Sequence, residues 1–361
     1  MRISRETQNR AVLVVVALAV GAAAFALARN DPFGHKGSGL APVFSLDLKS
    51  LIRVDPAWIR YRETRGMAVP LDAVRAMAVG PGDRIHVAGD RAIFIAWPVE
   101  GTTATIPLDG EPTCLAVAGP GHEATGRIFV GVGDRVEAFS PGGESLGAWN
   151  TPGPNAHLTS IAVAARDLFV ADAANRVVHR FDFEGKRLGT IGEPDPERDM
   201  PGFVVPSPFF DIAVEPTDGG ELLHVANPGK LRIETFAFDG QLQSFWGEAG
   251  SDIDRFFGCC NPSQFAMTAD GRFVTSEKGI PRVKIHDASG RLECVVAGPE
   301  QLGIAESEVG DPRADSGGQV FDVATDRAGR VLVLDPRSRR VRFFEPIAEA
   351  PDPKPKPRPE P

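Results

Sequence analysis

The stretch IAVAARDLFVADAANRVVHRFDFEGK, residues 161–186, decides the fold of this chain. It holds three short apolar segments separated by turns: an opening IAV, then LFVAD (168–172) and VVHRFD (177–182). A turn at Gly185 leads into a further apolar segment, LGTIG (188–192). Short β-branched and aromatic runs bounded by Gly, Asn and Asp predict strands and turns. This stretch is therefore expected to form a four-stranded antiparallel sheet.

The same pattern occurs six times along the chain. The opening segments, each with a central Ala, are Met77–Val79, Leu115–Val117, Ile161–Val163, Ile212–Val214, Phe265–Met267 and Val323–Thr325. The second segments are 85–89, 128–132, 168–172, 223–227, 274–277 and 332–335. Turn glycines recur at Gly143, Gly185, Gly240 and Gly290, about 40–55 residues apart, which is the period of a propeller blade. The repeat predicts an all-β chain folded as a six-bladed β-propeller.

These repeats resemble those of the NHL family, whose members build such propellers. The copy at 161–186 is the best match, and the resemblance extends over roughly residues 70–347. It implies a fold and not an activity. It also implies where a site would lie, because in such propellers the inter-blade loops and the turns between second and third strands gather on one face. We call this the loop face, and binding sites of the family usually lie there, over the central channel.

The sixth repeat lacks a fourth strand after Phe344, because the chain enters a Pro-rich segment. Propellers of the family that the repeats resemble commonly close with a strand borrowed from a terminus. The alternating sequence WIRYR (58–62) precedes the first repeat and is the expected donor, since closure removes exposed sheet edges. This divides the chain into a tether (30–54), a propeller (55–347) closed by strand 58–62, and an extended Pro-rich tail (348–361).

Residues 1–29 carry the features of a signal anchor or transmembrane helix. Three arginines precede an uncharged apolar run from Ala11 to Ala28, which as a helix is roughly 27 Å long, close to the ~30 Å hydrocarbon core. Arginines on the near side predict a cytoplasmic N-terminus and a single pass through the inner membrane, with the propeller in the periplasm. Because Ala26–Ala28 resembles an A-x-A cleavage site, a cleaved signal peptide is the alternative.

The composition narrows the choice of partners. Asp and Glu total 48 against 39 Lys and Arg, which gives a formal net charge of −9, and the propeller repeats carry no long basic run. A nucleic-acid partner is excluded on this ground, because phosphate binding needs a clustered basic surface. We expect a protein or peptide partner in the cell envelope, besides the membrane contact of residues 11–28.

The segment WGEAGSDIDRFFGCCNP (246–262) is the most unusual of three long inter-blade loops, and it contains the adjacent Cys259 and Cys260. Vicinal cysteines can form a strained disulfide ring, stay as separately packed thiols, or serve copper binding or redox exchange. An oxidising compartment favours the disulfide. The two other cysteines, Cys114 and Cys294, fall in strands of different blades and are expected to be buried.

A charged turn, SEKGIPR (276–282), lies between the second and third strands of the fifth repeat. The NHL resemblance places this turn on the same face as the cysteine loop, which directly precedes the inner strand of that repeat. A solvated, salt-bridged turn is the alternative to a functional one. We predict a binding surface here, and its residues are Cys259, Cys260, Asn261, Glu277, Lys278 and Arg282.

The residue before each opening apolar–Ala pair is expected at the mouth of the central channel. These residues are Ala76, Cys114, Ser160, Asp211, Gln264 and Asp322. Carboxylate, amide and hydroxyl oxygens are ligands for a hard cation, so Ser160, Asp211, Gln264 and Asp322 form a possible Ca²⁺ site. The alternative is that polar side chains only solvate a wet channel.

No catalytic residues are assigned from the sequence. None of the six channel-mouth positions is His, unlike in amidating lyases that share the propeller, and no G-x-S-x-G motif is present. The main hypothesis is a membrane-tethered extracytoplasmic propeller that binds a protein or peptide, or acts as a scaffold, through its loop face. The alternatives are a Ca²⁺-dependent lactonase-like hydrolase at the channel mouth and a redox or copper-handling accessory that uses Cys259 and Cys260.

Overall fold

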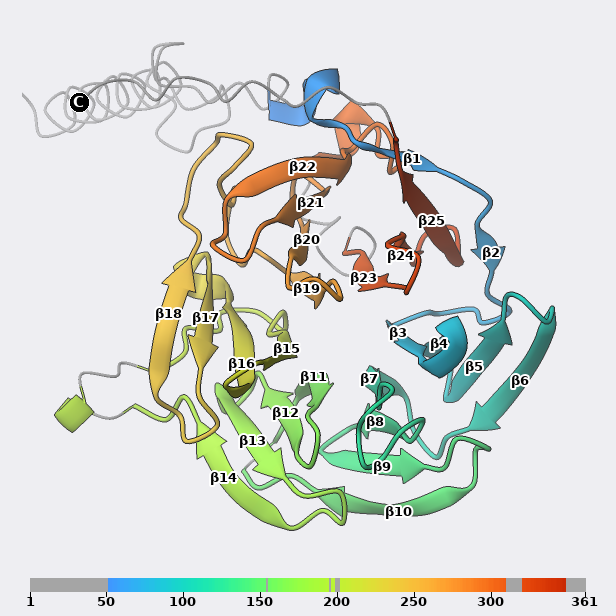
Figure 1. The fold of residues 1–361 in the computed structure, drawn as a ribbon, viewed down its shortest axis with the longest axis vertical. Coiled ribbons are helices and arrows are strands. Elements are labelled where there is room, and N and C mark those ends of the chain that lie inside the picture. The colour runs from blue at the N-terminus through green and yellow to red at the C-terminus, as the bar shows by residue number, and fades with distance from the viewer. Residues whose placement is uncertain (1–50, 154, 195, 199–201, 310–319, 349–361) are drawn as a thin grey trace, which may run out of the picture. The chain divides into compact units, whose positions relative to one another are not determined.

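The computed structural model describes residues 51–348 apart from 154, 195, 199–201 and 310–319, and the structural statements below concern these residues. The chain divides into two units, 1–47 and 48–361, and the first lies outside the described residues. Every described strand belongs to one of six sheets arranged around a central axis (Figure 1). The prediction of an all-β six-bladed propeller is therefore confirmed.

Each of the first five blades is a four-stranded antiparallel sheet whose strands follow the chain from the channel to the rim. Blade one is β3 (Ala76–Gly80), β4 (Arg84–Gly89), β5 (Ala92–Trp97) and β6 (Thr102–Pro107). Blade two is β7 (Pro112–Val117), β8 (Ile128–Val132), β9 (Arg135–Phe139) and β10 (Ser145–Asn150). Blade three is β11 (Leu158–Val163), β12 (Leu168–Asp172), β13 (Val177–Phe181) and β14 (Arg187–Ile191).

Blade four is β15 (Ile212–Thr217), β16 (Gly220–Asn227), β17 (Arg232–Phe236) and β18 (Leu242–Trp246). Blade five is β19 (Gln264–Met267), β20 (Phe273–Glu277), β21 (Arg282–His286) and β22 (Leu292–Ala297). Blade six begins with β23 (Asp322–Thr325), β24 (Val331–Asp335) and β25 (Arg340–Pro346). Short 3₁₀ turns are η2 (Pro56–Trp58), η3 (Pro81–Asp83), η4 (Pro196–Arg198), η5 (Pro228–Lys230) and η6 (Glu306–Glu308).

The core of the propeller lies between the blades. The second strands β8, β12, β20 and β24 are buried along their whole length, whereas the outer strand β10 is almost wholly exposed. Burial on both faces explains why the second strands read as continuous apolar runs and not as alternating ones. Each of the six blade interfaces has its own apolar cluster, and the smallest, between blades four and five, comprises Ala226, Ile233, Phe265 and Phe273.

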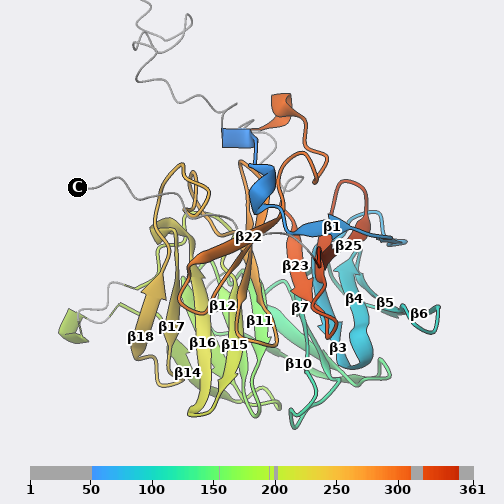
Figure 2. The ribbon, with the colours of Figure 1, turned by 45° about the horizontal axis from the view of Figure 1, so that its top comes forward.

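The ring closes with residues from the N-terminal side of the propeller. β1 (Tyr61–Glu63) and β2 (Met67–Ala68) both pair antiparallel with β25, which supplies blade six with its outer strand (Figures 1 and 2). In the register, Tyr61 lies opposite Pro346 and Met67 opposite Val341. The closing strand thus begins three residues later than the predicted 58–62.

The predicted start of that strand is wrong for a local reason. Pro56 opens the turn η2, which runs to Trp58, and the Asp55 carboxylate accepts the backbone N–H of Ala57 at 2.9 Å. The backbone N–H groups of Trp58 and Ile59 donate to the carbonyls of Asp55 and Pro56 within this turn, at 2.9 and 3.1 Å, so they do not pair with β25. Ile59 instead bridges Val295 of β22, so this part of the segment belongs to blade five.

Among the described residues, no helix is both long enough and apolar enough to cross a bilayer. The predicted anchor at 11–28, nearly all of the tether and the tail from 349 onward lie outside the described residues.

Candidate functional site

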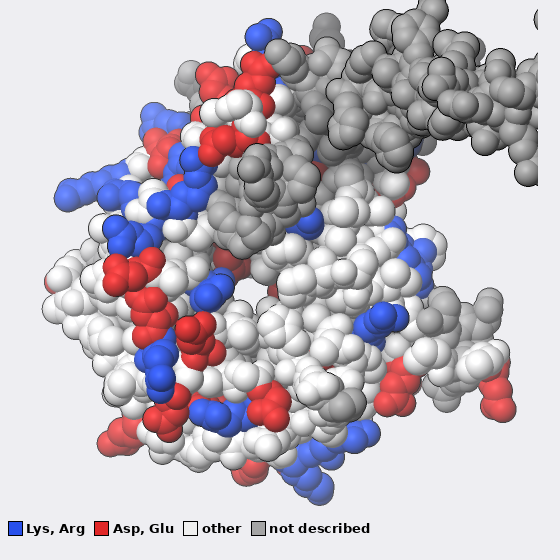
Figure 3. Space-filling view, turned by 180° about the vertical axis from the view of Figure 1, so that it is seen from behind, with Lys and Arg blue, Asp and Glu red and all other residues white. Residues whose placement is uncertain are grey.

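The loop face follows directly from the antiparallel order of the strands. The inner strands begin on the same face on which the second strands end, so the channel-mouth residues, the turns into the third strands and the inter-blade loops share it. Figure 3 views the ring from behind Figure 1 and shows the central opening, with acidic and basic side chains interspersed along one side of it. Much of the other side of this view carries no charged side chain.

In blade five the structure brings the cysteine loop and the charged turn into contact. The Asn261 carboxamide accepts the backbone N–H of Lys278 at 2.9 Å and donates to the Lys278 carbonyl at 3.1 Å. It also donates to the carbonyl of Phe257 at 2.6 Å, within its own loop. Asn261 is fully buried, so its side chain joins the loop to the turn without a water in between. The sequence prediction that these two segments are neighbours is confirmed.

The two cysteines of this loop differ in exposure. Cys259 is exposed, Cys260 is 5 % exposed, and neither is in a disulfide. Burial raises the pKa of the Cys260 thiol, while the positive charge of Lys278 acts in the opposite direction. Burial also raises the pKa values of Cys114 and Cys294, each to about 12. The expectation that these two are ordinary buried cysteines is confirmed.

The charged turn is not the solvated feature that its sequence indicates. Glu277 is 0 % exposed and Arg282 is 1 % exposed, and the Arg282 guanidinium donates to the Glu277 carboxylate at 2.6 and 3.2 Å. The other carboxylate oxygen of Glu277 is paired with the ammonium of Lys284, which is also fully buried. Sequence reasoning missed Lys284, and the available signal was a lysine between the apolar Val283 and Ile285 in strand β21.

Lys284 fixes the loop that precedes the cysteines. Its ammonium donates to the backbone carbonyls of Ile253 at 3.1 Å and Arg255 at 2.9 Å, and it lies 4.9 Å from the ring centre of Phe256. Burial lowers the pKa of Lys284 to about 8, although the charge of Glu277 opposes the shift. The buried ion pairs of Glu277, Arg282 and Lys284 thus tie the inter-blade loop to the sheet of blade five.

The six channel-mouth residues do converge, and they line a cavity of about 120 Å³ at the axis. The side chains of three of these residues accept hydrogen bonds from backbone N–H groups of the next blade. The Asp211 carboxylate accepts the N–H of Phe265 at 2.6 Å, and the Asp322 carboxylate accepts the N–H of Met77 at 2.6 Å. The Ser160 hydroxyl accepts the N–H of Ile212 at 3.3 Å. Each hydrogen bond joins neighbouring inner strands, so these side chains act as clamps between blades.

Both channel aspartates have raised pKa values. Burial raises the pKa of Asp211 to about 6, and burial together with the charge of Asp211 raises that of Asp322 to about 7. The second oxygen of each carboxylate accepts a further N–H, from Ile212 and Val323 respectively, at 2.9 and 2.8 Å. The described residues contain no group of three or more His, Cys, Asp or Glu side chains arranged to hold a metal ion. A Ca²⁺ site here stays a prediction. The hydrogen bonds show that Asp211, Asp322 and Ser160 connect neighbouring blades.

Replacing Asp322 by Asn is expected to destabilise the fold most at low pH. The amide nitrogen cannot accept the Met77 N–H, so we expect a loss of about 1–3 kcal/mol at pH 4.5. Ionised Asp322 itself destabilises the folded state, because its pKa is raised above the unfolded value. The difference between variant and wild type should therefore shrink as the pH rises through about 7.

Chemical unfolding at pH 4.5, 6 and 8 measures this effect. Thr325→Val is the matched control, because the Thr325 hydroxyl donates to the Met267 carbonyl of the neighbouring inner strand at 2.8 Å and does not titrate. Its cost in unfolding free energy should be the same at all three pH values. If Asp322→Asn lowered the free energy of unfolding by the same amount at all three pH values, the raised pKa of Asp322 would be contradicted.

The described histidines take no part in the channel. None of them lines the axial cavity, and His224 packs edge-on against Phe273 of the next blade with ring centres 5.0 Å apart. His224 also contacts the Glu215 carboxylate at 2.9 Å. His224 thus packs between blades four and five.

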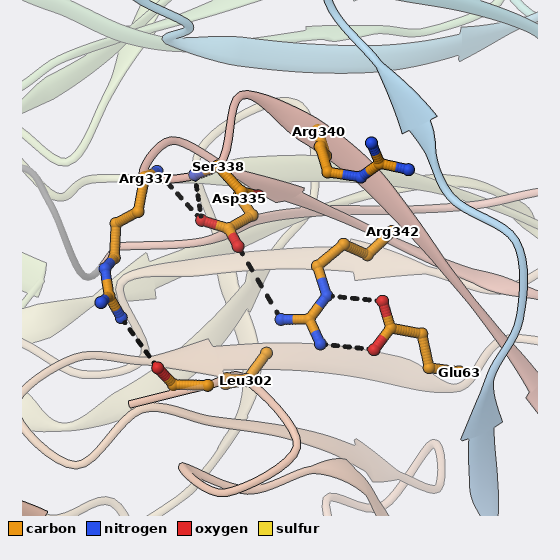
Figure 4. Close-up of a pocket in the computed structure, with 8 residues that line it drawn as sticks. Glu63, Leu302, Asp335, Arg337, Ser338, Arg340 and Arg342 are labelled. Carbon is orange, nitrogen blue, oxygen red and sulfur yellow. Dashed lines mark hydrogen bonds and ion pairs between the residues drawn. The ribbon is translucent and has the colours of Figure 1, made fainter. Parts of the chain in front are cut away.

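A second cavity, which the sequence analysis did not find, lies at the seam where the ring closes. It is an open groove of about 400 Å³ (Figure 4), lined by Glu63, Leu302, Gly303, Asp335, Arg337, Ser338, Arg340 and Arg342. Arg342 lies between Glu63 and Asp335, and its Nε donates to Glu63 at 2.8 Å. Arg337 extends toward the loop after β22 and donates to the Gly303 carbonyl at 3.2 Å. We call this cavity the seam groove.

No protein-family profile and no curated protein sequence matches the chain. Among solved structures, a streptogramin B lyase is 9 % identical and aligns with a TM-score of 0.53 over 81 % of this chain and 100 % of that one. A protein of unknown function from Bacteroides caccae is 13 % identical, with a TM-score of 0.48 over 64 % of this chain and 84 % of that one. At such identities the likeness concerns the fold alone. The chain is a six-bladed β-propeller, and its NHL resemblance stays at the level of the repeat pattern.

Proposed function

We propose that this protein is a membrane-tethered extracytoplasmic propeller that binds a protein or peptide on its loop face. The observation that carries the proposal is the seam groove, which is open and lined by side chains of both charges. An open polar groove fits the extended backbone and side chains of a peptide, whereas small-molecule sites enclose most of their ligand. The groove lies on the loop face because it is built from the β24–β25 turn and an inter-blade loop.

The walls of the seam groove are held in place before any partner binds. Arg342 is paired with Glu63 from the N-terminal segment and with Asp335 from β24. Arg337 is paired with Glu308 at 3.2 Å, and Arg340 donates to the carbonyl of Gly66 at 3.0 Å. A preformed surface loses little conformational entropy on binding, which favours affinity. The blade-five surface of Cys259, with its buried ion pairs, is a second rigid part of the same face.

Site-specific cross-linking in native membranes tests this function with the full-length protein. A photo-activated cross-linker is attached at Ser338→Cys, which is exposed and lines the seam groove. The matched control is Ala328→Cys, which is exposed in the β23–β24 turn at the opposite end of the same blade. Both variants carry Cys259→Ser, which removes the one exposed native thiol.

We expect a discrete adduct from position 338 and none from position 328. Adding Arg340→Glu should reduce that adduct several-fold, because it reverses a charge on the groove wall without touching the buried ion pairs. Equal adducts from both positions, or none from either, would overturn the proposal.

The membrane tether is part of the proposal and has its own test. Fractionation should recover the full-length chain in the inner membrane, with the propeller accessible to protease only after the outer compartment is opened. The reason is the apolar run at 11–28 with arginines before it. A mature chain that begins at Arg29 would mean that the segment is a cleaved signal peptide.

A lactonase-like hydrolase is the second candidate, because Asp211 and Asp322 lie near one another in the axial cavity and both have raised pKa values. It requires calcium in the purified protein, and elemental analysis measures this. Stoichiometric calcium would favour the hydrolase over the binding module, and copper would favour a metal-handling role of the cysteine pair.

A further inference from the structure

The two cysteines of blade five are placed as an attacking and a resolving thiol. Cys259 is exposed to solution, whereas Cys260, the next residue, is 5 % exposed. The space beside Gly258 is open, since a side chain there would meet nothing within 4 Å. A reagent can therefore reach the Cys259 sulfur, while the sulfur of the adjacent Cys260 is shielded from it.

A positive charge acts on the buried thiol, because the Lys278 ammonium favours the Cys260 thiolate. The Lys278 ammonium lies 5.3 Å from the ring centre of Phe209 and is itself largely buried. A cation beside a thiol lowers the energy of the thiolate, which is the form that attacks a disulfide. Burial acts against this, so Cys260 suits the second, intramolecular step more than the first.

The backbone at the pair is held in an uncommon conformation. Cys260 has φ +63°, in the left-handed region that costs a residue with a side chain roughly 1–2 kcal/mol. The buried Asn261 side chain holds the chain there through its hydrogen bonds to Phe257 and Lys278. Strain that the surroundings maintain is typical of functional sites.

We propose that Cys259 and Cys260 form a reversible thiol–disulfide site that exchanges with an external disulfide, either a small molecule or a protein. The Cys259 thiolate attacks one sulfur of the external disulfide, whose S–S bond breaks and releases one thiolate, which takes up a proton. Cys260 then loses its proton and attacks the Cys259 sulfur, which expels the second thiol. In sum the two cysteine thiols are oxidised to one vicinal disulfide, and the external disulfide is reduced to two thiols.

This proposal does not rest on the proposed binding function. The experiment measures only the oxidation of Cys259 and Cys260, so its result is independent of whether a partner binds the loop face. Purified full-length protein is incubated with oxidised glutathione, and the thiols are then blocked and the protein digested with trypsin. The peptide 256–272 contains Cys259 and Cys260 and no other cysteine, so its mass reports on the pair alone. We expect this peptide to lose two hydrogen atoms, and to regain them after treatment with dithiothreitol.

Two single variants separate the steps. Cys260→Ser should stop at the first step, so that peptide 256–272 carries one glutathione on Cys259. Cys259→Ser should not react, because the remaining thiol is buried. Circular dichroism of both variants checks that the propeller is folded.

A stable glutathione adduct on wild-type Cys259, an intermolecular disulfide through Cys259, or no reaction at all would each overturn the proposal. In those outcomes Cys259 is an ordinary surface thiol, and Cys260 takes no part in its chemistry.

Discussion

A variant that lacks residues 30–68 is expected to lose the closed ring. It lacks β1 and β2, so the backbone of β25 becomes an open sheet edge, and the apolar cluster of blades five and six loses the buried Tyr61. Exposed edges pair with other chains, so we expect aggregation. The remaining folded protein should melt at least about 10 °C lower, since each lost kcal/mol lowers Tm by about 2–4 °C in a domain of this size.

The matched control lacks residues 30–50 only, and so retains both closing strands. Size-exclusion chromatography and thermal melts of the two deletions, made in the same detergent, measure the difference. If both deletions melted alike and stayed monomeric, the closing strands would not stabilise the ring.

The second large effect is expected from Glu277→Gln. It keeps the shape of the side chain but removes the charge that both Arg282 and Lys284 face in the interior of blade five. Removing one partner of a buried ion pair leaves an uncompensated charge, which costs about 3–5 kcal/mol. Guanidinium unfolding followed by tryptophan fluorescence measures this cost.

Asp270→Asn, in the same blade, is the control. Asp270 is also paired with an arginine, Arg272, but its side chain is 64 % exposed. Exposed pairs contribute about 0–1 kcal/mol, so this variant should unfold nearly as the wild type does. Equal costs of the two substitutions would mean that water reaches Glu277 and that the blade-five loop is not anchored by buried charge.

The strand pattern was predictable because it depends on residues near in sequence. All six opening triplets lie in the inner strands β3, β7, β11, β15, β19 and β23. The segment that closes the ring was also predictable, but the start of its strand was not, because Pro56 and Asp55 form a turn that holds Ile59 against blade five. The local turn at Pro56–Trp58, and not the alternating pattern of 58–62, therefore determines where the closing strand begins.

The sites were harder to predict than the fold. The sequence indicated that the channel-mouth residues converge. It could not show that the carboxylates of Asp211 and Asp322 accept hydrogen bonds from backbone N–H groups of other blades. SEKGIPR reads as a surface turn. Strand alternation puts Lys284 on the same side of β21 as Arg282, but nothing local indicates that this side is buried. The seam groove joins Glu63 to residues near 302 and 340, and a pairing over such separations leaves no local signal.

The way in which the ring closes also has a consequence for the order of synthesis. Glu63 and Arg342 are 279 residues apart, so the first strand to leave the ribosome waits unpaired until nearly the whole propeller has been made. Blades one to five can form in turn as they emerge, but β1 and β2 have no partner until β25 of blade six has been made. Contacts between such distant residues form slowly. The interval before the two ends meet is thus the stage at which a nascent chain is most exposed to proteases and to its neighbours.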